Sequence, residues 1–325
     1  MAVFLLVFPT KSWAVGGLNL TTSPLPISLI ADASSTVSAQ LKVKNGGNES
    51  EVIKIGLMKF GAYGADGKPK ILDREKGDEY FDWVTFSPES FSLAPNEWKT
   101  VTMTINIPAN AAFGYYYAVT FSRKETVSES ASKTTNIAGA VATLVLLEVR
   151  SANAVRKLEL DDFFVDKKVY EFLPVNFMVK LKNSGNVHVL PSGNIFISQG
   201  SQKNLAILSF NETVGNILPD SFRNYLTKWT EGFPVHKEKI VDGKVVNFLD
   251  WDLTKITNLR IGKYRATLLL AYDDGNRDVP LQAYIDFWVI PWRIILFGGV
   301  MIILIGFGLN SVIKTVFGGF KKKKR

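Results

Sequence analysis

One apolar stretch near the C-terminus constrains this chain more than any other feature. From Ile294 to Ile313 twenty residues carry no charge, and a helix of about 20 residues at 1.5 Å per residue crosses the roughly 30 Å hydrocarbon core of a bilayer. Trp288 and Trp292 precede the stretch, and indole rings favour the headgroup layer. The sequence therefore predicts a transmembrane helix over residues 291–313, with these two tryptophans as membrane-interface anchors. A buried core helix is the less favoured alternative.

A basic segment follows the predicted helix. Its positive residues are Lys314, Lys321, Lys322, Lys323, Lys324 and Arg325. Segments rich in Lys and Arg next to a membrane helix stay on the cytoplasmic side. We therefore expect residues 314–325 to form a basic cytoplasmic tail and everything before Trp292 to lie outside the cell membrane.

The N-terminus carries a second, shorter apolar run over residues 2–8. Ser12 and Ala14 then supply the small residues of a signal-peptidase site, although no Lys or Arg precedes the run. The pattern predicts a signal peptide over residues 1–14. A cleaved signal and a stop-transfer helix predict the same single-pass orientation.

The net charge of +8 belongs to these two ends and not to the folded part. Eight positive residues lie before Val15 or after Trp292, where there is no acid, so 30 basic and 30 acidic residues balance between those two positions. A neutral ectodomain excludes nucleic acid as its partner, since phosphate binding needs a basic surface. The absence of Cys excludes disulfides, thiolate metal sites and cysteine nucleophiles.

Between the two ends, short stretches alternate between apolar and polar residues with a period of two. Examples are Val37, Ala39, Leu41 and Val43, and later Val175, Phe177, Val179 and Leu181. Such runs, broken by Gly, Pro, Asn and Asp about every ten residues, predict antiparallel strands of a β-sandwich.

An internal repeat divides this part of the chain. The pattern K-N-x-G-N begins at Lys44 and again at Lys182, each time at the end of an alternating strand. Downstream, G-x-Y-x-A occurs at Gly114 and at Gly262, which predicts Tyr116 and Tyr264 as equivalent tyrosine corners of immunoglobulin-like sandwiches. Two landmarks in the same order predict one sandwich used twice.

The repeat sets the predicted organisation of the chain. We expect an all-β ectodomain of two immunoglobulin-like β-sandwich domains in tandem, over residues 15–150 and 151–290, followed by one transmembrane α-helix and the basic tail. The first domain has a polar loop over residues 125–136, whose simpler interpretation is a hairpin tip. The second has an insertion around residues 232–246, a candidate contact loop.

The search for reactive residues finds few candidates. Neither His188 nor His236 has a sequence partner at metal-ligand or catalytic spacing, and no signature of a known enzyme class is present. The acidic residues at 273–278 lack the spacing of an EF-hand, and Asp-Gly between two strands favours a hairpin turn over a calcium site. We expect no cofactor, no metal site and no enzymatic activity.

Several motifs are similar to one family of bacterial surface proteins. The turn at Leu93, Ala94 and Pro95, the strand ending at Pro108 and the G-Y-Y-Y-A strand from Gly114 resemble the N-terminal domain of the WxL-interacting protein family. That resemblance implies a second sandwich, a membrane helix, a lysine-rich tail and binding to cell wall or surface proteins without catalysis. The middle of the second domain matches no pattern of that family.

Two functional hypotheses follow. The first is a non-enzymatic, membrane-anchored protein of the bacterial cell surface that presents its two sandwiches to a surface protein or cell-wall glycan, with membrane lipid around its helix. The alternative is a membrane-tethered, chaperone-like assembly factor that offers a sheet edge to an exported subunit.

Overall fold

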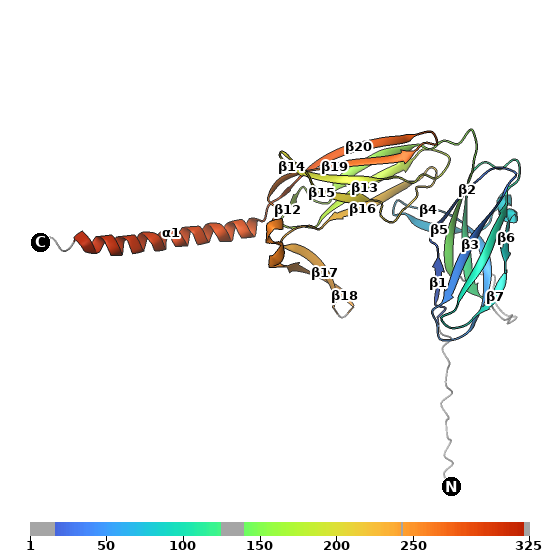
Figure 1. Cartoon of the computed structure of the whole chain (residues 1–325), viewed down its shortest axis with the longest axis horizontal. Coiled ribbons are helices and arrows are strands. Elements are labelled where there is room, and N and C mark those ends of the chain that lie inside the picture. Colours follow the sequence, from blue (N-terminus) through green and yellow to red (C-terminus); the bar gives the residue numbers. More distant parts are fainter. Residues whose placement is uncertain (1–16, 125–139, 242, 322–325) are drawn as a thin grey trace, which may run out of the picture. The chain divides into compact units, whose positions relative to one another are not determined.

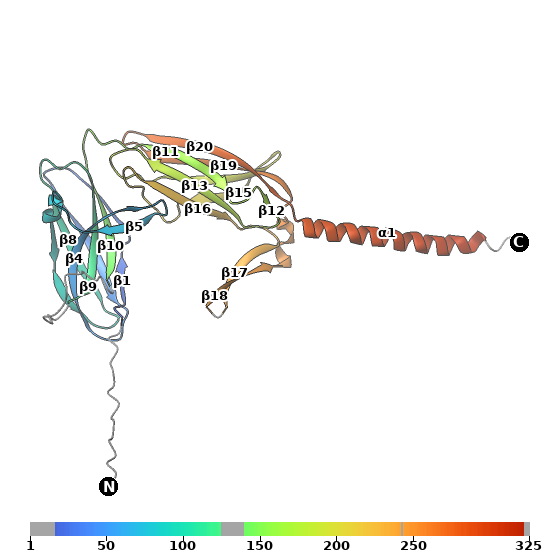
Figure 2. The same ribbon diagram turned by 180° about the vertical axis from the view of Figure 1, so that it is seen from behind.

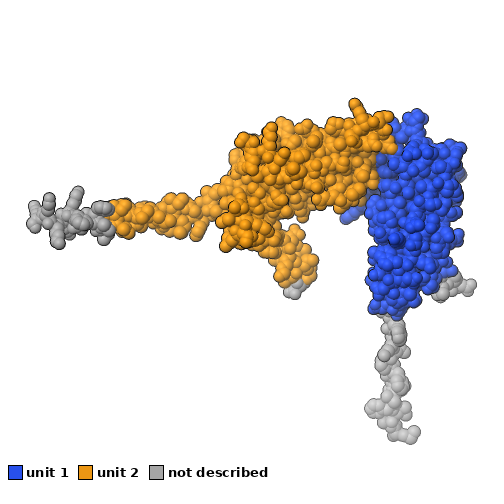
Figure 3. All heavy atoms as spheres, viewed as in Figure 1, with its two compact units in different colours: residues 1–63, 68–155, 186–188 blue, residues 64–67, 156–185, 189–325 orange. Residues whose placement is uncertain are grey.

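A computed structural model describes residues 17–124, 140–241 and 243–321 of the chain, and the side chains up to Lys314. The predicted signal peptide, the whole predicted loop at 125–136, and the tail residues Lys322, Lys323, Lys324 and Arg325 lie outside the described residues. The chain forms two compact units, shown in different colours in Figure 3. Unit 1 contains residues 1–63, 68–155 and 186–188, and unit 2 contains residues 64–67, 156–185 and 189–325.

Unit 1 is a sandwich of two sheets whose strands pair antiparallel, except for the parallel pair β2 and β10. One sheet has the order β1-β3-β8-β6, and the other has the order β2-β10-β9-β4-β5, with β7 also paired to β4. The strands are β1 Leu20–Ser23, β2 Ile27–Ala31, β3 Thr36–Asn45, β4 Glu51–Tyr63, β5 Lys68–Leu72, β6 Val84–Ser87, β7 Ser90–Leu93, β8 Trp98–Asn106, β9 Phe113–Arg123 and β10 Val141–Val149, with the 3-10 helix η1 Glu79–Trp83 before β6. Figure 2 shows β10 beside β9.

Unit 2 repeats this arrangement. Its sheets have the orders β11-β13-β16 and β12-β20-β19-β14-β15, and a separate hairpin joins β17 to β18 (Figure 1). The strands are β11 Leu158–Val165, β12 Val169–Tyr170, β13 Val175–Asn183, β14 Ser192–Gln199, β15 Gln202–Phe210, β16 Phe222–Trp229, β17 Val235–Val241, β18 Lys244–Asp250, β19 Gly262–Asp273 and β20 Asp278–Val289, with the 3-10 helix η2 Leu253–Asn258 before β19. The insertion predicted at residues 232–246 therefore contains β17 and the start of β18.

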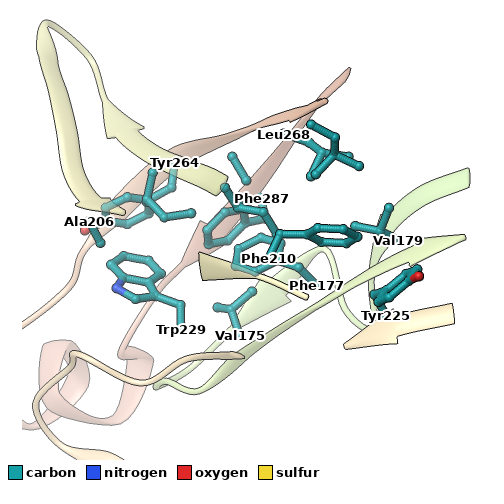
Figure 4. Packing of buried hydrophobic residues seen from close by; sticks show 14 of the residues in the cluster. Val175, Phe177, Val179, Ala206, Phe210, Tyr225, Trp229, Tyr264, Leu268 and Phe287 are labelled. Atoms are coloured by element: carbon teal, nitrogen blue, oxygen red, sulfur yellow. The ribbon is translucent and has the colours of Figure 1, made fainter. Parts of the chain in front are cut away.

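The fold class predicted from the alternating strands is confirmed: both units are immunoglobulin-like β-sandwiches. In each, the inward residues of the two sheets form one apolar core. The core of unit 2 centres on Trp229, Tyr264 and Phe287, whose ring centroids lie 5.4 to 6.2 Å apart (Figure 4). These three rings join both sheets, because β16 belongs to one and β19 and β20 to the other.

The asparagines of the K-N-x-G-N repeat have the same role in both units. Asn45 ends β3, accepts a hydrogen bond from the amide of Gly47 and donates to the carbonyl of Leu93. Asn183 ends β13, accepts from the amide of Gly185 and donates to the carbonyl of Ile217. Both side chains are buried. Each asparagine thus shapes a turn and joins it to a neighbouring segment.

The predicted equivalence of Tyr116 and Tyr264 is wrong. Tyr264 faces the core of unit 2, whereas Tyr116 lies on the outer face of its sheet, against Phe60. By register, the counterpart of Tyr264 is Tyr115. Tyr115 pairs with the residue two positions before the end of β10, and Tyr264 pairs with the residue two positions before the end of β20. A shift of one residue along a strand moves a side chain to the other face.

Local hydrogen bonds agree with this correction. The hydroxyl of Tyr264 donates to the carbonyl of Ile261 at 3.5 Å, and the hydroxyl of Tyr115 accepts from the amide of Ala112 at 3.2 Å. Both contacts reach the backbone three residues upstream, as in a tyrosine corner. Gly114 has another role, because a Cβ there would lie 2.3 Å from the hydroxyl oxygen of Tyr116.

The chain ends in one long helix, α1 Trp292–Lys321. Its segment from Trp292 to Lys314 has a mean hydropathy of 2.2 and is not buried against the rest of the described chain, so it is long and apolar enough to cross a membrane. At 1.5 Å per residue this segment is about 34 Å long, slightly more than the hydrocarbon core.

Candidate strand-docking edges

Strand β10 of unit 1 has an open side. It pairs with β9 along all nine of its residues, but β2 pairs with it only from Val145 to Val149. Within the described residues, positions 141–144 therefore have a hydrogen-bonded strand on one side only. An open strand edge presents unpaired backbone donors and acceptors to another chain.

The backbone groups at this edge can be assigned. The amide of Arg150 donates to the carbonyl of Ala31 in β2. Successive residues of a strand point their backbone groups to alternate sides, so the N–H and C=O groups of Ala142 and Leu144 point to the same side as those of Arg150. Those of Val141 and Thr143 point to β9.

The side chains along the open stretch are uncharged. Val141 and Thr143 face the core of unit 1, and Ala142 and Leu144 lie half-buried on the outer face. Neither face has a charge or a proline within this stretch. An extended segment that pairs here would continue the sheet and bring its own alternate side chains against an apolar border.

Strand β20 of unit 2 occupies the equivalent position but has a different edge. It pairs with β19 along twelve residues, and β12 covers only Trp288 and Val289. The amide of Trp288 donates to the carbonyl of Lys168, so the backbone groups of Gln282 and Tyr284 point to the open side. By register, Gln282 is the counterpart of Ala142.

This second edge has features that discourage pairing. Pro280 stands at an outward-pointing position and has no N–H to donate, which is where proline is tolerated in an edge strand. Asp286 adds a negative charge beside the open stretch. Arg265 and then Lys263 bind its carboxylate and hold the pKa of Asp286 well below its usual range. Proline and charge are the usual protection of sheet edges against unwanted strands.

The acidic residues at 273–278 form the expected hairpin turn between β19 and β20. The carboxylate of Asp273 accepts from the amide of Gly275, and that of Asp274 accepts from the amides of Asn276 and Arg277. These bonds lower the pKa of Asp274. Among the described residues there is no group of three or more His, Cys, Asp or Glu side chains placed to hold a metal ion.

The other predicted site residues are distributed over the chain. His236 lies in β17 against the ring of Phe172, and His188 is buried in unit 1. Trp288 lies exposed at the end of β20, and Trp292 is the first residue of α1. Lys314 ends the apolar segment of α1, and Lys321 is its last described residue.

Comparisons with known proteins find no match by sequence. No family model matches the chain, and no curated protein matches it. The chain is similar to solved structures of fimbrial chaperones. The class 5 fimbriae chaperone CfaA is 16% identical over 71% of this chain and 99% of its own, with a TM-score of 0.34.

Two further structures have comparable values. The chaperone DraB of E. coli is 12% identical over 82% of this chain and 98% of its own, with a TM-score of 0.32. The matching chain of the CsuC–CsuE chaperone–tip adhesion subunit pre-assembly complex of Acinetobacter baumannii is 12% identical over 63% of this chain and 89% of its own, with a TM-score of 0.32. Likeness at these values does not extend to function.

Sequence reasoning missed the open edge of β10. The continuous apolar run over residues 140–149 is typical of a strand, but it does not show how far the neighbouring strand extends. The sequence offers one indication of this edge. The run has neither proline nor charge before Glu148, whereas the matching run of unit 2, residues 280–287, contains Pro280 and Asp286.

Proposed function

We propose that this protein is a membrane-anchored binding protein that captures an extended segment of an exported protein at the open edge of β10. One observation carries the proposal. Residues 141–144 form an uncharged edge with no proline or charge beside it before Glu148, whereas the equivalent positions 281–284 of the second sandwich directly follow Pro280 and come two residues before Asp286. Folded proteins normally protect such edges, so an edge that lacks proline and charge in one of two like domains favours use as a binding surface.

The chemistry of recognition follows from the edge. Backbone N–H and C=O groups of Ala142 and Leu144 would pair with those of the captured segment and supply affinity that does not depend on its sequence. The apolar border formed by Val141 and Leu144 favours a segment with alternating apolar residues. This is the chaperone-like alternative of the two sequence hypotheses, with a surface protein as partner.

The anchor and its orientation are part of the same proposal. The helix α1 holds both units at a cell membrane, and the basic residues after it place the C-terminus in the cytoplasm. The resemblance to the WxL-interacting protein family and a cell-wall glycan as partner stay predictions.

A pair of proline substitutions tests the edge. Ala142→Pro removes an N–H that points to the open side and leaves the bonds to β9 intact, so unit 1 should fold and lose its partner. Gln282→Pro makes the same change at the equivalent position of β20 and should have no effect on binding. Partner contact is read from a photo-crosslinking residue at position 144 in the producing cells, with adducts mapped by mass spectrometry.

We expect position 144 to cross-link to a single peptide segment of an exported protein. The yield of this adduct should fall at least about tenfold after Ala142→Pro, which corresponds to a loss of about 1.4 kcal/mol in binding free energy. Moving the crosslinker from position 144 to 142 should move the adduct by two residues along that segment, as strand pairing requires. Equal cross-linking in both proline variants, or adducts scattered over many segments, would contradict capture by β10.

A further inference from the structure

The start of α1 is fixed to unit 2 by specific contacts. Only Ile290 and Pro291 separate β20 from the helix. The amide of Ile290 donates to the carbonyl of Tyr170 at 2.7 Å, and the guanidinium of Arg293 lies 3.4 Å from the carboxylate of Glu171. Three residues of chain span at most about 10 Å, so Val289 at the end of β20 stays that close to Trp292.

The segment between β18 and β19 packs on the same end of the sandwich. The ring of Trp251 lies 6.3 Å from that of Phe172, the residue after Glu171, and 5.8 Å from that of Phe233. The amide of Phe233 donates to the carbonyl of Asn258 at the end of η2. Trp251 and η2 are thereby held near the residues that bind the start of α1.

This segment exposes large apolar side chains. Trp251 is 51% exposed, Leu253 is 70% exposed and Ile256 is 56% exposed, all within six residues. None of them belongs to the core of unit 2. Three such side chains together, on an end of the sandwich that also exposes Trp288 and Trp292, form the kind of apolar surface that contacts a partner or a membrane.

We infer that Trp251, Leu253 and Ile256 insert into the interfacial layer of the bilayer beside α1 and form a second membrane contact. The inference rests on the proposed role of α1 as a membrane anchor. The segment from Trp292 to Lys314 slightly exceeds the hydrocarbon core, so Trp292 lies at the outer headgroup layer. That layer is about 5–8 Å thick on each side, and the end of β20, from which the sandwich reaches α1, lies within about 10 Å of Trp292.

The composition of the segment also fits this occupant. Interfacial segments combine Trp, Leu and Ile with lysines that reach to the headgroups. Lys255 lies between Leu253 and Ile256, and the one acid of this segment, Asp252, is neutralised by Lys255 at 3.2 Å. Two attachment points would fix the tilt of unit 2 on the membrane, whereas a single helix would let it rotate.

Tryptophan fluorescence in nanodiscs tests the contact. In the full chain, Trp13, Trp83, Trp98, Trp251, Trp288 and Trp292 are replaced by Phe, and the fully buried Trp229 is kept to preserve the core. Trp251 or Trp292 is then restored singly. Each protein is placed in nanodiscs of phosphatidylcholine and phosphatidylglycerol, with and without bromine on the acyl chains near the headgroups.

The expected result is strong bromine quenching of the emission added by Trp251 and by Trp292, with little quenching in the protein that has only Trp229. Quenching at Trp292 without quenching at Trp251 would overturn the second contact and leave the anchor intact. An unquenched Trp292 would overturn the anchor itself, and with it the inference. As a second variant, Leu253→Asp with Ile256→Asp should abolish the quenching of Trp251 but not that of Trp292.

Discussion

At the scale of single residues, polar side chains define the two sandwiches as repeats. Asn45 and Asn183 each close a turn through their own oxygen and reach a carbonyl of another segment through their nitrogen. Only Asn combines an acceptor and a donor at this side-chain length. The K-N-x-G-N pattern was therefore a reliable guide, because its chemistry is local and does not depend on the pairing of distant strands.

The replacement Asn183→Ala should destabilise unit 2 by about 2 kcal/mol or more, since it leaves the amide of Gly185 and the carbonyl of Ile217 without this buried partner. Denaturant unfolding in detergent of the full chain with Trp229 as its only tryptophan, followed by the fluorescence of that residue in the core of unit 2, measures this change. Asn247→Ala on the exposed strand β18 is the matched control and should change stability by less than about 0.5 kcal/mol. A small effect at Asn183 would show that water replaces its bonds.

The tyrosine motif was less reliable than the asparagine motif. The letters G-x-Y-x-A place Tyr116 with Tyr264, but the ladders place Tyr115 there and turn Tyr116 to the outer face. With three successive tyrosines, the sequence alone does not show which of them face the core. The pairing of β9 with the neighbouring strands β10 and β4 decides it.

At the scale of elements, the alternating runs predicted strands well. Strands β3 and β13 follow the runs that begin near Val37 and Val175. The alternating runs do not predict which strands pair. An open sheet edge depends on how far a strand from a distant part of the sequence extends. The open stretch of β10 exists because β2 begins only at Ile27, the partner of Val145, and no pattern within β10 records that.

Hydrogen exchange should detect the open edge directly. In the protein without a partner, the amides of Ala142 and Leu144 should exchange quickly and those of Val141 and Thr143 slowly, because only the latter bond to β9. A bound segment should slow the first pair and leave Gln282 on β20 unchanged. Residue-resolved exchange measured by NMR follows all five amides. Slow exchange at Ala142 before any partner is added would mean that another part of the chain covers the edge.

At the scale of the whole molecule, the sequence predicted the order of parts: two sandwiches and then an apolar helix. Long hydrophobic runs and period-two patterns report on burial, which dominates the fold. The binding surfaces were less predictable. The sequence predicted an insertion where the structure has the β17–β18 hairpin. Trp251 and Leu253 are residue types that are usually buried, so their exposure becomes apparent only from the residues around them in the structure.

Membrane orientation is the prediction on which the proposed function depends most. Protease added to intact producing cells should remove both sandwich units and leave a C-terminal tag protected, because the lysines after α1 hold that end in the cytoplasm. A variant with Glu in place of all four lysines should have a smaller fraction of protein in this orientation; the lysines are Lys321, Lys322, Lys323 and Lys324. The predicted signal peptide should keep the remaining fraction correctly oriented. The same four positions changed to Arg keep the charge and serve as the control. Protection of unit 1 in intact cells would place the β10 edge in the cytoplasm, where no exported segment reaches it after translocation.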